Sequence, residues 1–474
     1  MKKEVLTLNS HKHVIFSKTV SDLIEEDFTY QKEYWIKDWA GRKKKKLRDV
    51  DIINKVPKKP LYYVGGGFLH KIKEILKKKK IEFSVVGENG YKEYPCGLTP
   101  FRGIDFRGNQ KKIIEKALKH NRGVIHAYTS FGKTFTAANL INSYLAKYPG
   151  KKAIFLAHRI DLVEQTNEEF IRFGLNSVVW KGKSRKMADV VCVTRQTLKK
   201  TPLKEYADKF LICIRDECHN AGNDYEQILF NLNSPVRYGV TATLPNDRLK
   251  SLELEGSVGP VVGTVTIQEG AEMGILAVPE VYMVSYEDSG ADDSPRNYFE
   301  LYDNCIVENV ARNQAIFDIA ENALKTGEST LIFVREKEHV AFLEKSLKKL
   351  GVKTVAGETK AATRMKIKKE LESKETKVVV CSTIWNEGIS VKSINNIIVG
   401  GAGKDDKMVM QIVGRGTRID EGKNTVKIWD FVDPYKSLSI QCLNRMRVYS
   451  NQGWEVKVVA SKHSKGIFKN IKGE

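Results

Sequence analysis

The chain has 474 residues, which at roughly 150 residues per domain suggests about three domains, and its 41% hydrophobic content is sufficient for packed cores. The net charge of +21 favours a polyanionic partner, because Lys and Arg gain free energy by displacing counterions from phosphates, although a generally Lys-rich proteome gives the same excess. No stretch approaches the roughly 18–20 apolar residues of a membrane span, the first residues lack the apolar region of a signal peptide, and seven scattered cysteines predict reduced thiols rather than disulfides or a zinc site.

Residues 1–98 are predicted to form a small basic α/β accessory domain that binds DNA. The first 100 residues hold 22 Lys and Arg against 13 Asp and Glu, with basic clusters at Arg42–Lys46 and Lys77–Lys80. A strand that ends in a glycine turn is expected at 62–67, and an amphipathic helix at 68–80. The interleaved aromatic residues either stack on bases or form the small core of the domain: Tyr34, Trp35, Trp39, Tyr62, Tyr63 and Phe68.

From Asn109 onward, short apolar runs alternate with helical stretches, which is the pattern of a parallel sheet with crossover helices. The first set of runs lies at 123–128, 152–158, 189–194, 210–217 and 237–243. The second set lies at 330–334, 352–357, 377–382, 395–401 and 426–432. We therefore expect one parallel-sheet domain at 99–265, a segment at 266–300 that serves as linker and entry to the next domain, and a second parallel-sheet domain with a basic tail at 301–474.

Residues 127–134 read AYTSFGKT, which matches the phosphate-binding loop pattern G-x-x-x-x-G-K-[ST] except that Ala127 replaces the first glycine. The loop follows an apolar run and precedes a helical stretch, as the pattern requires. Lys133 is expected to neutralise the β and γ phosphates of a nucleotide, and the Thr134 hydroxyl to ligate Mg²⁺. A chance Gly-Lys-Thr at a helix start is the alternative. The residues assigned to the nucleotide here are Thr129, Ser130, Gly132, Lys133 and Thr134.

Residues 216–219 read DECH directly after an apolar run, so Asp216 is expected at the carboxyl end of a strand, where open α/β sheets bind ligands. Following a triphosphate loop, Asp216 is predicted to hold Mg²⁺ through water, and Glu217 to orient or deprotonate the attacking water. A lone Asp-Glu pair is more often a solvated turn, but its position after the loop favours the catalytic interpretation. His219 can also be a purely structural hydrogen-bonding residue.

Four blocks in this order, AYTSFGKT, DECH, GVTAT (239–243) and QIVGRGTR (411–418), resemble those of superfamily 2 helicases and translocases. FRGNQ, LAHRIDLVEQ, VCVTRQTL and CSTIWNEGISV fit further motifs, so the resemblance covers about residues 100–435. The Arg-x-x-Gln element, the basic domain before the motor, LAVPEV and RMRVYSNQGW resemble the phage UvsW helicase family, with RecG-like and XPB-like relatives. The resemblance implies an α/β fold of two tandem RecA-like parallel-sheet motor domains preceded by the small basic α/β accessory domain.

The resemblance also implies ATP and Mg²⁺ as cofactors and assigns roles that the spacing alone does not. Gln110, with Arg107, would read the adenine, and Gln411 would help to join the two motor domains around ATP. Arg415 and Arg418 would act as arginine fingers beside the catalytic Lys133, Asp216 and Glu217. Residues that relay the nucleotide state would be His219, Thr241, Thr243, Glu387 and Gly388. The sequence departs from the family pattern at Ala127, at Ser130, where glycine is frequent, and at Ser390, where an acidic residue is frequent.

A motor that steps independently of sequence grips the phosphate backbone through N–H groups, hydroxyls and basic side chains. The blocks that resemble strand-contacting motifs supply candidates in both motor domains, and each of them can instead be an ordinary loop residue. The candidates are His158, Arg159, Thr194, Arg195 and Gln196 in the first domain, and Arg335, Gly357, Thr359 and Thr383 in the second.

The sequence thus predicts an ATP-dependent DNA helicase or translocase that remodels branched DNA in recombination, repair or replication, by branch migration, fork regression or unwinding of R-loops and D-loops. The expected partners are single-stranded and branched DNA and RNA–DNA hybrids, without a membrane. The protein is expected to be a cytoplasmic monomer, in the host cytoplasm if its source is viral. Three alternatives remain open: an RNA helicase, a nucleic-acid-binding protein with degenerate ATPase motifs, and the motor subunit of a restriction complex.

Overall fold

The computed structural model describes residues 3–9, 12–37, 43–87, 92–128, 130–219, 228–229, 231–245, 247–287, 290–294, 297–382, 391–401, 403, 406–420 and 422–460. Two compact units make up the chain. The first holds Met1–Ala127 and Gly132–Thr264, and the second holds Tyr128–Phe131 and Val265–Glu474. Among the described helices, none is both long and apolar enough to cross a membrane.

The first unit begins with a five-stranded sheet in the order β5-β6-β2-β1-β7. Alternate residues of β1 and β2 are buried, so these strands place one apolar face against a core and leave the other face partly exposed. The helices α1 (Lys18–Phe28) and α2 (Leu69–Lys78) bury Ile24, Phe28, Ile72 and Leu76 in that core. The strands are β1 (Glu4–Asn9), β2 (His13–Ser17), β5 (Asn54–Lys55), β6 (Leu61–Gly65) and β7 (Phe83–Gly87).

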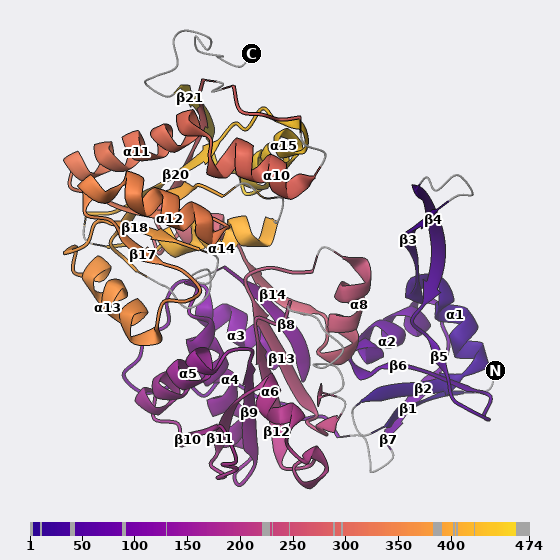
Figure 1. The fold of residues 1–474 in the computed structure, drawn as a ribbon. Coiled ribbons are helices and arrows are strands. Elements are labelled where there is room, and N and C mark those ends of the chain that lie inside the picture. Colours follow the sequence, from indigo (N-terminus) through magenta and orange to yellow (C-terminus); the bar gives the residue numbers. More distant parts are fainter. Residues whose placement is uncertain are drawn as a thin grey trace. The chain divides into compact units, whose positions relative to one another are not determined.

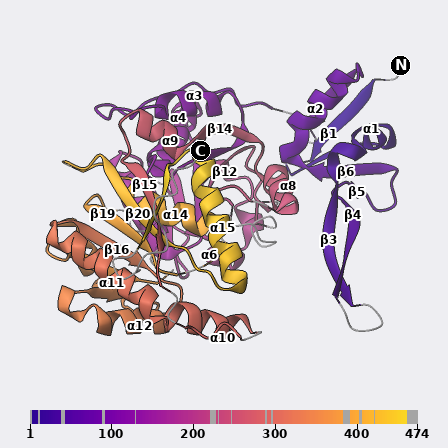
Figure 2. The same cartoon turned by 90° about the horizontal axis from the view of Figure 1, so that it is seen from above.

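A two-stranded antiparallel ribbon extends from this domain, built from β3 (Thr29–Lys37) and β4 (Lys43–Asp51). The register pairs Thr29 with Asp51 at its base and Lys37 with Lys43 at its far end. Both views show the ribbon projecting away from the five-stranded sheet (Figures 1 and 2). The predicted basic cluster Arg42–Lys46 therefore falls largely on a strand that the sequence analysis did not anticipate. Trp39 lies outside the described residues, as do the side chains of Tyr34 and Trp35.

The larger part of the first unit is a seven-stranded sheet in the order β10-β11-β9-β12-β13-β8-β14. Pairs from β10 to β8 with a described register are parallel, and β8, β9, β11, β12 and β13 are almost wholly buried, as their β-branched composition predicts. The strands are β8 (Arg122–Ala127), β9 (Lys152–Ala157), β10 (Ser177–Trp180), β11 (Val190–Thr194), β12 (Phe210–Asp216), β13 (Val236–Thr241) and β14 (Val261–Val265). The helices are α3 (Gln110–Leu118), α4 (Lys133–Lys147), α5 (Ile160–Arg172), α6 (Arg195–Lys199) and α8 (Arg248–Ser257).

Helix α8 joins the accessory domain to this sheet. Its Leu252 is part of the accessory domain's apolar core, which also contains Phe68. The two backbones approach so closely that a Cβ atom added to Gly67 would lie 1.8 Å from the carbonyl oxygen of Glu255, and one added to Gly65 would lie 2.5 Å from that of Gly256. Only glycine permits such an approach, so the accessory domain is packed directly on a helix of the motor.

The second unit contains a seven-stranded sheet in the order β17-β18-β16-β19-β20-β15-β21, whose described pairs are parallel. The strands are β15 (Val278–Ser285), β16 (Ser329–Phe333), β17 (Lys353–Val355), β18 (Val378–Cys381), β19 (Ile394–Val399), β20 (Thr425–Phe431) and β21 (Val456–Ala460). The helices are α9 (Ile267–Glu272), α10 (Tyr298–Tyr302), α11 (Val310–Lys325), α12 (Lys337–Ser346), α13 (Ala361–Glu372), α14 (Asp406–Gly416) and α15 (Lys436–Asn451).

A buried ionic network stabilises the carboxyl end of β20 in this unit. Arg445 on α15 donates to both carboxylate oxygens of Asp430 at 2.8 and 3.0 Å, and Arg312 on α11 donates to Asp433 at 2.8 Å. The Tyr449 hydroxyl adds a hydrogen bond of 2.8 Å to Asp430. Because these side chains are almost fully buried, removing one member would leave its partner charged and unpaired, at a cost of about 3–5 kcal/mol.

The two parallel sheets with their helices, preceded by a small α/β domain, confirm the predicted fold class of tandem RecA-like domains. One difference concerns the segment 266–300, which the sequence analysis assigned to a linker. Its Val278–Ser285 is strand β15, paired with β20 on one side and β21 on the other. The strands β10, β14 and β21 were also not anticipated.

Candidate functional site

The phosphate-binding loop connects β8 to α4, which begins at Lys133. Gly132, immediately before the helix, has φ +88°, and a Cβ atom at this position would lie 2.6 Å from the Gln110 amide nitrogen. Glycine is therefore required here by both backbone conformation and space. Ser130 also has a positive φ, +80°, which L residues adopt at a cost of about 1 kcal/mol or more. Thr129 lies outside the described residues.

The carboxylates of DECH lie at the end of β12, next to this loop. Lys133 Nζ donates to Glu217 Oε1 at 2.7 Å, and both side chains are mostly buried, at 15% and 18% exposure. Glu217 has φ +42°, a left-handed conformation that is uncommon for a non-glycine residue and is often found at functional positions. Thus two residues 84 positions apart, both assigned to ATP chemistry, contact each other directly.

Burial and the nearby charge of Glu217 raise the pKa of Asp216 to about 6. Burial acts in the same direction on Glu217, but Lys133 and His219 outweigh it and hold the pKa of Glu217 well below its usual range. The two neighbouring carboxyl groups therefore differ in environment, which lowers the pKa of Glu217 and raises that of Asp216. Such a division of roles between adjacent acids is typical of catalytic sites.

A hydrogen-bonded chain leads from Glu217 to the end of β13. His219 Nδ1 lies 3.3 Å from Glu217 Oε2 and 2.7 Å from the Thr241 hydroxyl. That hydroxyl donates to the carbonyl oxygen of Thr243 at 2.7 Å, so it accepts at its contact with His219, and Nδ1 carries the hydrogen. The Thr243 hydroxyl is buried and has no hydrogen-bond partner among the described residues. Three of the residues predicted to relay the nucleotide state, His219, Thr241 and Thr243, are thus joined by hydrogen bonds.

Gln110 and Arg107, predicted to read the adenine, lie at the start of α3 and just before it. The Gln110 side chain is 3% exposed, and its carbonyl oxygen accepts a hydrogen bond of 2.8 Å from the Arg107 backbone N–H. The Arg107 side chain is exposed. Because the Gln110 amide nitrogen would touch a Cβ atom at Gly132, this glutamine is fixed against the phosphate-binding loop.

The nucleic-acid candidates of the first unit follow the adjacent strands β9 and β11. Arg159 forms an ion pair of 3.1 Å with Asp161. Thr194 caps helix α6 by accepting from the Thr197 N–H at 3.2 Å, so part of its function is structural. His158 and Arg195 are partly buried, whereas Gln196 is exposed. Their location at the carboxyl ends of two neighbouring strands is compatible with one binding surface.

The candidates of the second unit likewise follow strands. Arg335, after β16, donates to the Tyr298 hydroxyl at 3.2 Å and pairs with Glu336 at 3.2 Å. Thr359 closes a turn after β17 by accepting from the Ala356 N–H at 3.0 Å, and a Cβ atom at Gly357 would meet nothing within 4 Å. Gln411 and Arg415 lie one turn apart on α14, and Arg418 follows that helix. Thr383, Glu387, Gly388 and Ser390 lie outside the described residues.

Comparisons with known proteins place this site in a family. Residues 103–246 match the family model "Type III restriction enzyme, res subunit", and residues 312–420 match "Helicase conserved C-terminal domain". The chain is 25% identical to the ATP-dependent DNA helicase UvsW of Enterobacteria phage T4 over 342 residues, which covers 68% of each chain. The chain belongs to the superfamily 2 helicases.

As a superfamily 2 helicase, the protein binds ATP and is a nucleic-acid-dependent ATPase. It is also 25% identical to the Type I restriction enzyme EcoAI endonuclease subunit of Escherichia coli, over 72% of this helicase but only 47% of that relative. The solved structure of S. cerevisiae Dbp5 bound to RNA and ADP BeF3 has a TM-score of 0.54 and 18% identity, and covers 74% of the helicase and 90% of that chain. This likeness supports the fold alone.

One residue beside the site was missed by the sequence analysis. His126 on β8 places Nε2 3.1 Å from the carbonyl oxygen of Ala242, between Thr241 and Thr243. Burial, followed by the Lys133 charge, lowers its pKa although the hydrogen bond opposes this, so the neutral ring is favoured. The only signal in the sequence was its place on the apolar run before the phosphate-binding loop.

Proposed function

We propose that this helicase is a Mg²⁺-dependent DNA translocase that remodels branched DNA. In this proposal Lys133 binds the β and γ phosphates, Glu217 orients the attacking water, and Arg415 and Arg418 serve as arginine fingers. The contact between Lys133 and Glu217 is the observation that carries the catalytic assignment. Because Lys133 already neutralises Glu217, a triphosphate that draws Lys133 toward itself also releases the carboxylate for catalysis.

The oxygen ligands at the site fit Mg²⁺, which prefers carboxylate, hydroxyl and water ligands and retains several waters. Asp216 lies at the end of β12, and Thr134 lies in the first turn of α4. The raised pKa of Asp216 also fits, because a bound cation favours the ionised carboxyl that burial disfavours. When bound, Mg²⁺ would neutralise charge that develops on the phosphates; Asp216 and Thr134 are the residues that would hold it.

The relay in the first unit supports coupling between hydrolysis and movement. Glu217, His219 and Thr241 are in sequence within hydrogen-bonding or ion-pair distance, and the Thr243 hydroxyl is free to bond a group that arrives, as far as the described residues extend. A change in the contacts of the Glu217 carboxylate, such as the loss of Lys133 to a phosphate, therefore reaches the loop that follows β13 through a single histidine. We assign this loop to the path between the ATP site and the DNA.

The choice of DNA is supported by the UvsW match, and the choice of a branched substrate by the accessory domain. The accessory domain is fixed to the motor through α8 and carries a protruding ribbon whose second strand begins with four lysines (Figure 1). Basic ribbons of this kind suit the phosphate backbone of a duplex arm. UvsW, which is matched over 68% of both chains, is named an ATP-dependent DNA helicase.

Steady-state ATP turnover with no nucleic acid, single-stranded DNA, a four-way DNA junction and single-stranded RNA tests the proposal. We expect the junction to stimulate turnover most. Strongest stimulation by RNA would contradict the substrate while leaving the motor intact. A restriction motor is the second candidate, favoured by the first family model and the EcoAI match; turnover that requires linear duplex DNA and an added partner subunit would support it.

A further inference from the structure

A pocket of about 290 Å³ lies at the seam between the accessory domain and the first motor sheet. The accessory domain forms one wall, with His70 and Lys73 of α2. The other wall runs from the end of α3 to the start of β8 and includes Lys119 and Arg122. Lys92, in the chain that connects the two domains, completes the basic lining. Because α8 is shared by both domains, these walls belong to one packed structure.

The pocket has an excess of positive charge. Glu93 is the single acidic residue in its lining, and its distance to Lys73 is 3.8 Å. Glu255, which faces the seam from α8, lies 3.5 Å from His70. The lining thus contains four Lys and Arg residues against the one acid Glu93: Lys73, Lys92, Lys119 and Arg122. Lys92 and Lys119 are exposed, so both can reach a ligand at the mouth of the pocket.

One histidine of the lining responds to the same positive charge. Burial, and then His70, Lys119 and the nearby Lys116, lower the pKa of His120. Every neighbouring charge named here acts to repel a proton. A surface that disfavours added positive charge in this way favours an anion.

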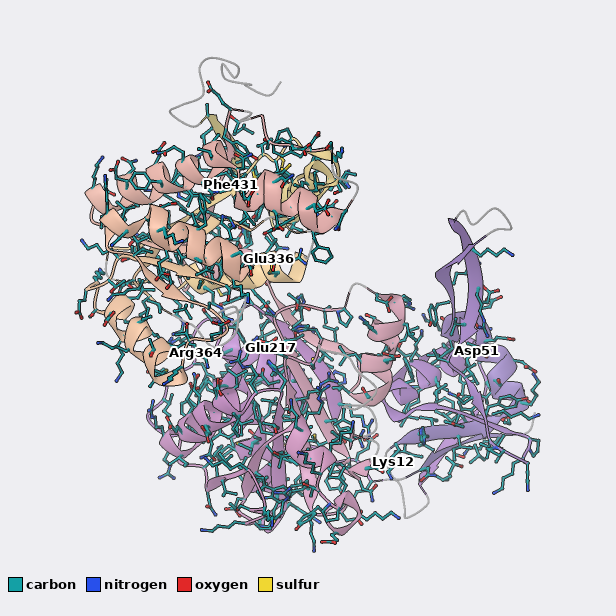
Figure 3. The ribbon with its side chains drawn as sticks, in the orientation of Figure 1. Lys12, Asp51, Glu217, Glu336, Arg364 and Phe431 are labelled. Carbon is teal, nitrogen blue, oxygen red and sulfur yellow. The ribbon has the colours of Figure 1, made fainter. Side chains whose placement is uncertain are left out.

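The pocket lies at the opposite end of the sheet from the ATP site. Its motor residues, including Arg122, Pro235 and Pro260, are at or immediately before the first residues of β8, β13 and β14, whereas Lys133 and Asp216 follow or end strands. Six residues of extended strand separate the two ends by about 20 Å. Lys12 marks the position of the pocket, because its carbonyl oxygen accepts a hydrogen bond from the N–H of Gly66 in the lining. Figure 3 shows Lys12 well apart from Glu217. Nucleotide binding therefore does not account for the basic lining.

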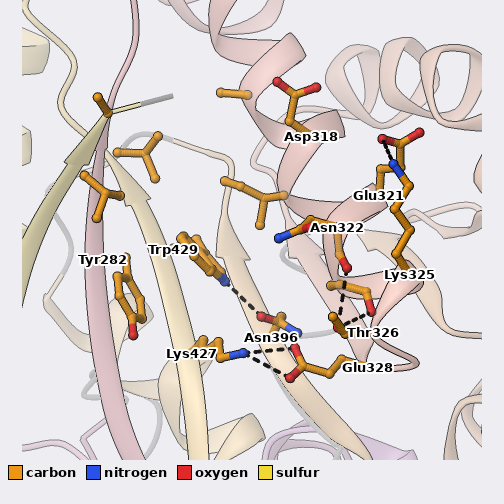
Figure 4. Close-up of a pocket in the computed structure, with 16 residues that line it drawn as sticks. Tyr282, Asp318, Glu321, Asn322, Lys325, Thr326, Glu328, Asn396, Lys427 and Trp429 are labelled. Carbon is orange, nitrogen blue, oxygen red and sulfur yellow. Dashed lines mark hydrogen bonds and ion pairs between the residues drawn. The ribbon is translucent and has the colours of Figure 1, made fainter. Parts of the chain in front are cut away.

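The second unit offers a contrast. Its pocket of about 370 Å³, between α11 and the sheet, is lined by charges that pair with one another (Figure 4). Lys427 contacts Glu328 at 3.0 Å, and Lys325 contacts Glu321 at 2.7 Å. The Trp429 indole N–H is likewise used, by Asn396 at 3.0 Å. The ion pairs that line this pocket thus balance one another, whereas the lining of the seam pocket has more basic than acidic residues.

We propose that the seam pocket is a second DNA site, which binds the phosphate backbone of a duplex arm outside the track of the motor. This inference rests on the proposed function, in which the DNA is branched and has an arm to place there. Lys92 and Lys119 are the contact residues, and Arg122 and His70 line the site behind them. The seam binds phosphates without reading bases, so its contribution is independent of sequence and sensitive to salt.

The test measures the affinity of the full-length protein for a four-way junction, a plain duplex and a single strand over a range of salt. The variants are Lys92→Ala and Lys119→Ala, and the control is Lys209→Ala, an exposed lysine that also precedes a strand of this sheet but lies outside the pocket. Each phosphate contact contributes about 0.9 to the slope of log K against log salt. Each seam variant should therefore lose about 0.9 of slope and about fivefold in affinity for the junction and the duplex at 0.15 M salt.

Single-strand affinity and the single-strand-stimulated ATPase should not change, nor should any property of the control. Unchanged duplex affinity in both seam variants would overturn the proposal, and so would an equal loss of single-strand affinity. A third outcome concerns inorganic phosphate. If phosphate raises Tm more than chloride does at equal ionic strength, and Lys119→Ala abolishes this effect without a loss of duplex affinity, the pocket binds a free anion instead of DNA. The plain duplex allows the two proposals to be tested separately. If the wild-type protein binds the junction no better than the duplex, the proposed function is contradicted. The duplex affinity of the seam variants still tests the seam pocket in that case.

Discussion

Replacing His219 by alanine should separate ATP binding from ATP hydrolysis. The imidazole donates to the Thr241 hydroxyl at 2.7 Å and lies 3.3 Å from Glu217. Without it, the buried Thr241 hydroxyl keeps, among the described residues, only the Thr243 N–H as a donor, at 3.2 Å, and the carboxylate loses a neighbour that helps to keep it ionised. The net contribution of one such hydrogen bond is about 0.5–1.5 kcal/mol. If that loss falls on the transition state, at 1.36 kcal/mol per factor of ten, hydrolysis slows by about 2- to 13-fold.

The assay is steady-state ATP turnover with and without single-stranded DNA, together with nucleotide affinity from a fluorescent ATP analogue. We expect kcat to fall and the stimulation by DNA to fall further, while nucleotide affinity stays within a factor of two or so, because His219 does not line the phosphate-binding loop. His219→Gln should restore part of the loss, since its amide can donate to the same two oxygens. A purely structural role would instead lower Tm and nucleotide affinity together. Equal stimulation by DNA in His219→Ala and wild type would refute the reasoning.

Lys133→Ala should abolish turnover while CD spectra remain native, and undiminished turnover in that variant would contradict the assignment of the loop. Because the pKa of Asp216 is raised to about 6, protons should compete with Mg²⁺ for this carboxylate below that pH. The Mg²⁺ concentration for half-maximal turnover should therefore rise as the pH falls through 6 and stay constant above it. A concentration that does not change with pH would exclude Asp216 as a ligand. Gly67→Ala forces a Cβ atom to within 1.8 Å of the Glu255 carbonyl oxygen and should destabilise the accessory domain by about 1–3 kcal/mol, with a lower Tm and weaker junction binding. Gly97→Ala, where the new atom meets nothing within 4 Å, is its control and should behave as wild type.

The sequence predicted the strands that are buried on both faces, because β11 and β18 are short runs of β-branched residues bounded by polar ones. It placed β15 in a linker, since VPEVYMVS contains a proline and a glutamate and lies beside an acidic stretch. The ribbon of β3 and β4 was missed because charged residues hide the period-two pattern of a strand. In these cases the partner strand, and not the local composition, determines the structure.

The sequence predicted those residues of the ATP site that belong to local motifs. Lys133 and Glu217 each stand in a recognisable block, but their direct contact depends on the order of the strands between them. The donation from His219 to Thr241 joins two loops 22 residues apart, and nothing in either block specifies the tautomer. The charged residues of the seam pocket come from three separate segments, and the charges of each segment are ordinary when it is read alone.

The sharing of Leu252 between a motor helix and the accessory core has a consequence for how such proteins diversify. A gene fusion that joined residues 1–98 to a different motor would supply the accessory sheet without the helix that completes its interior. Recombination that transfers the accessory domain must therefore carry α8, or a matching apolar helix after β13, along with it. The two parts are expected to be inherited together, and chimeric helicases built from them should fold only when Arg248–Ser257 comes from the same parent as the N-terminal residues.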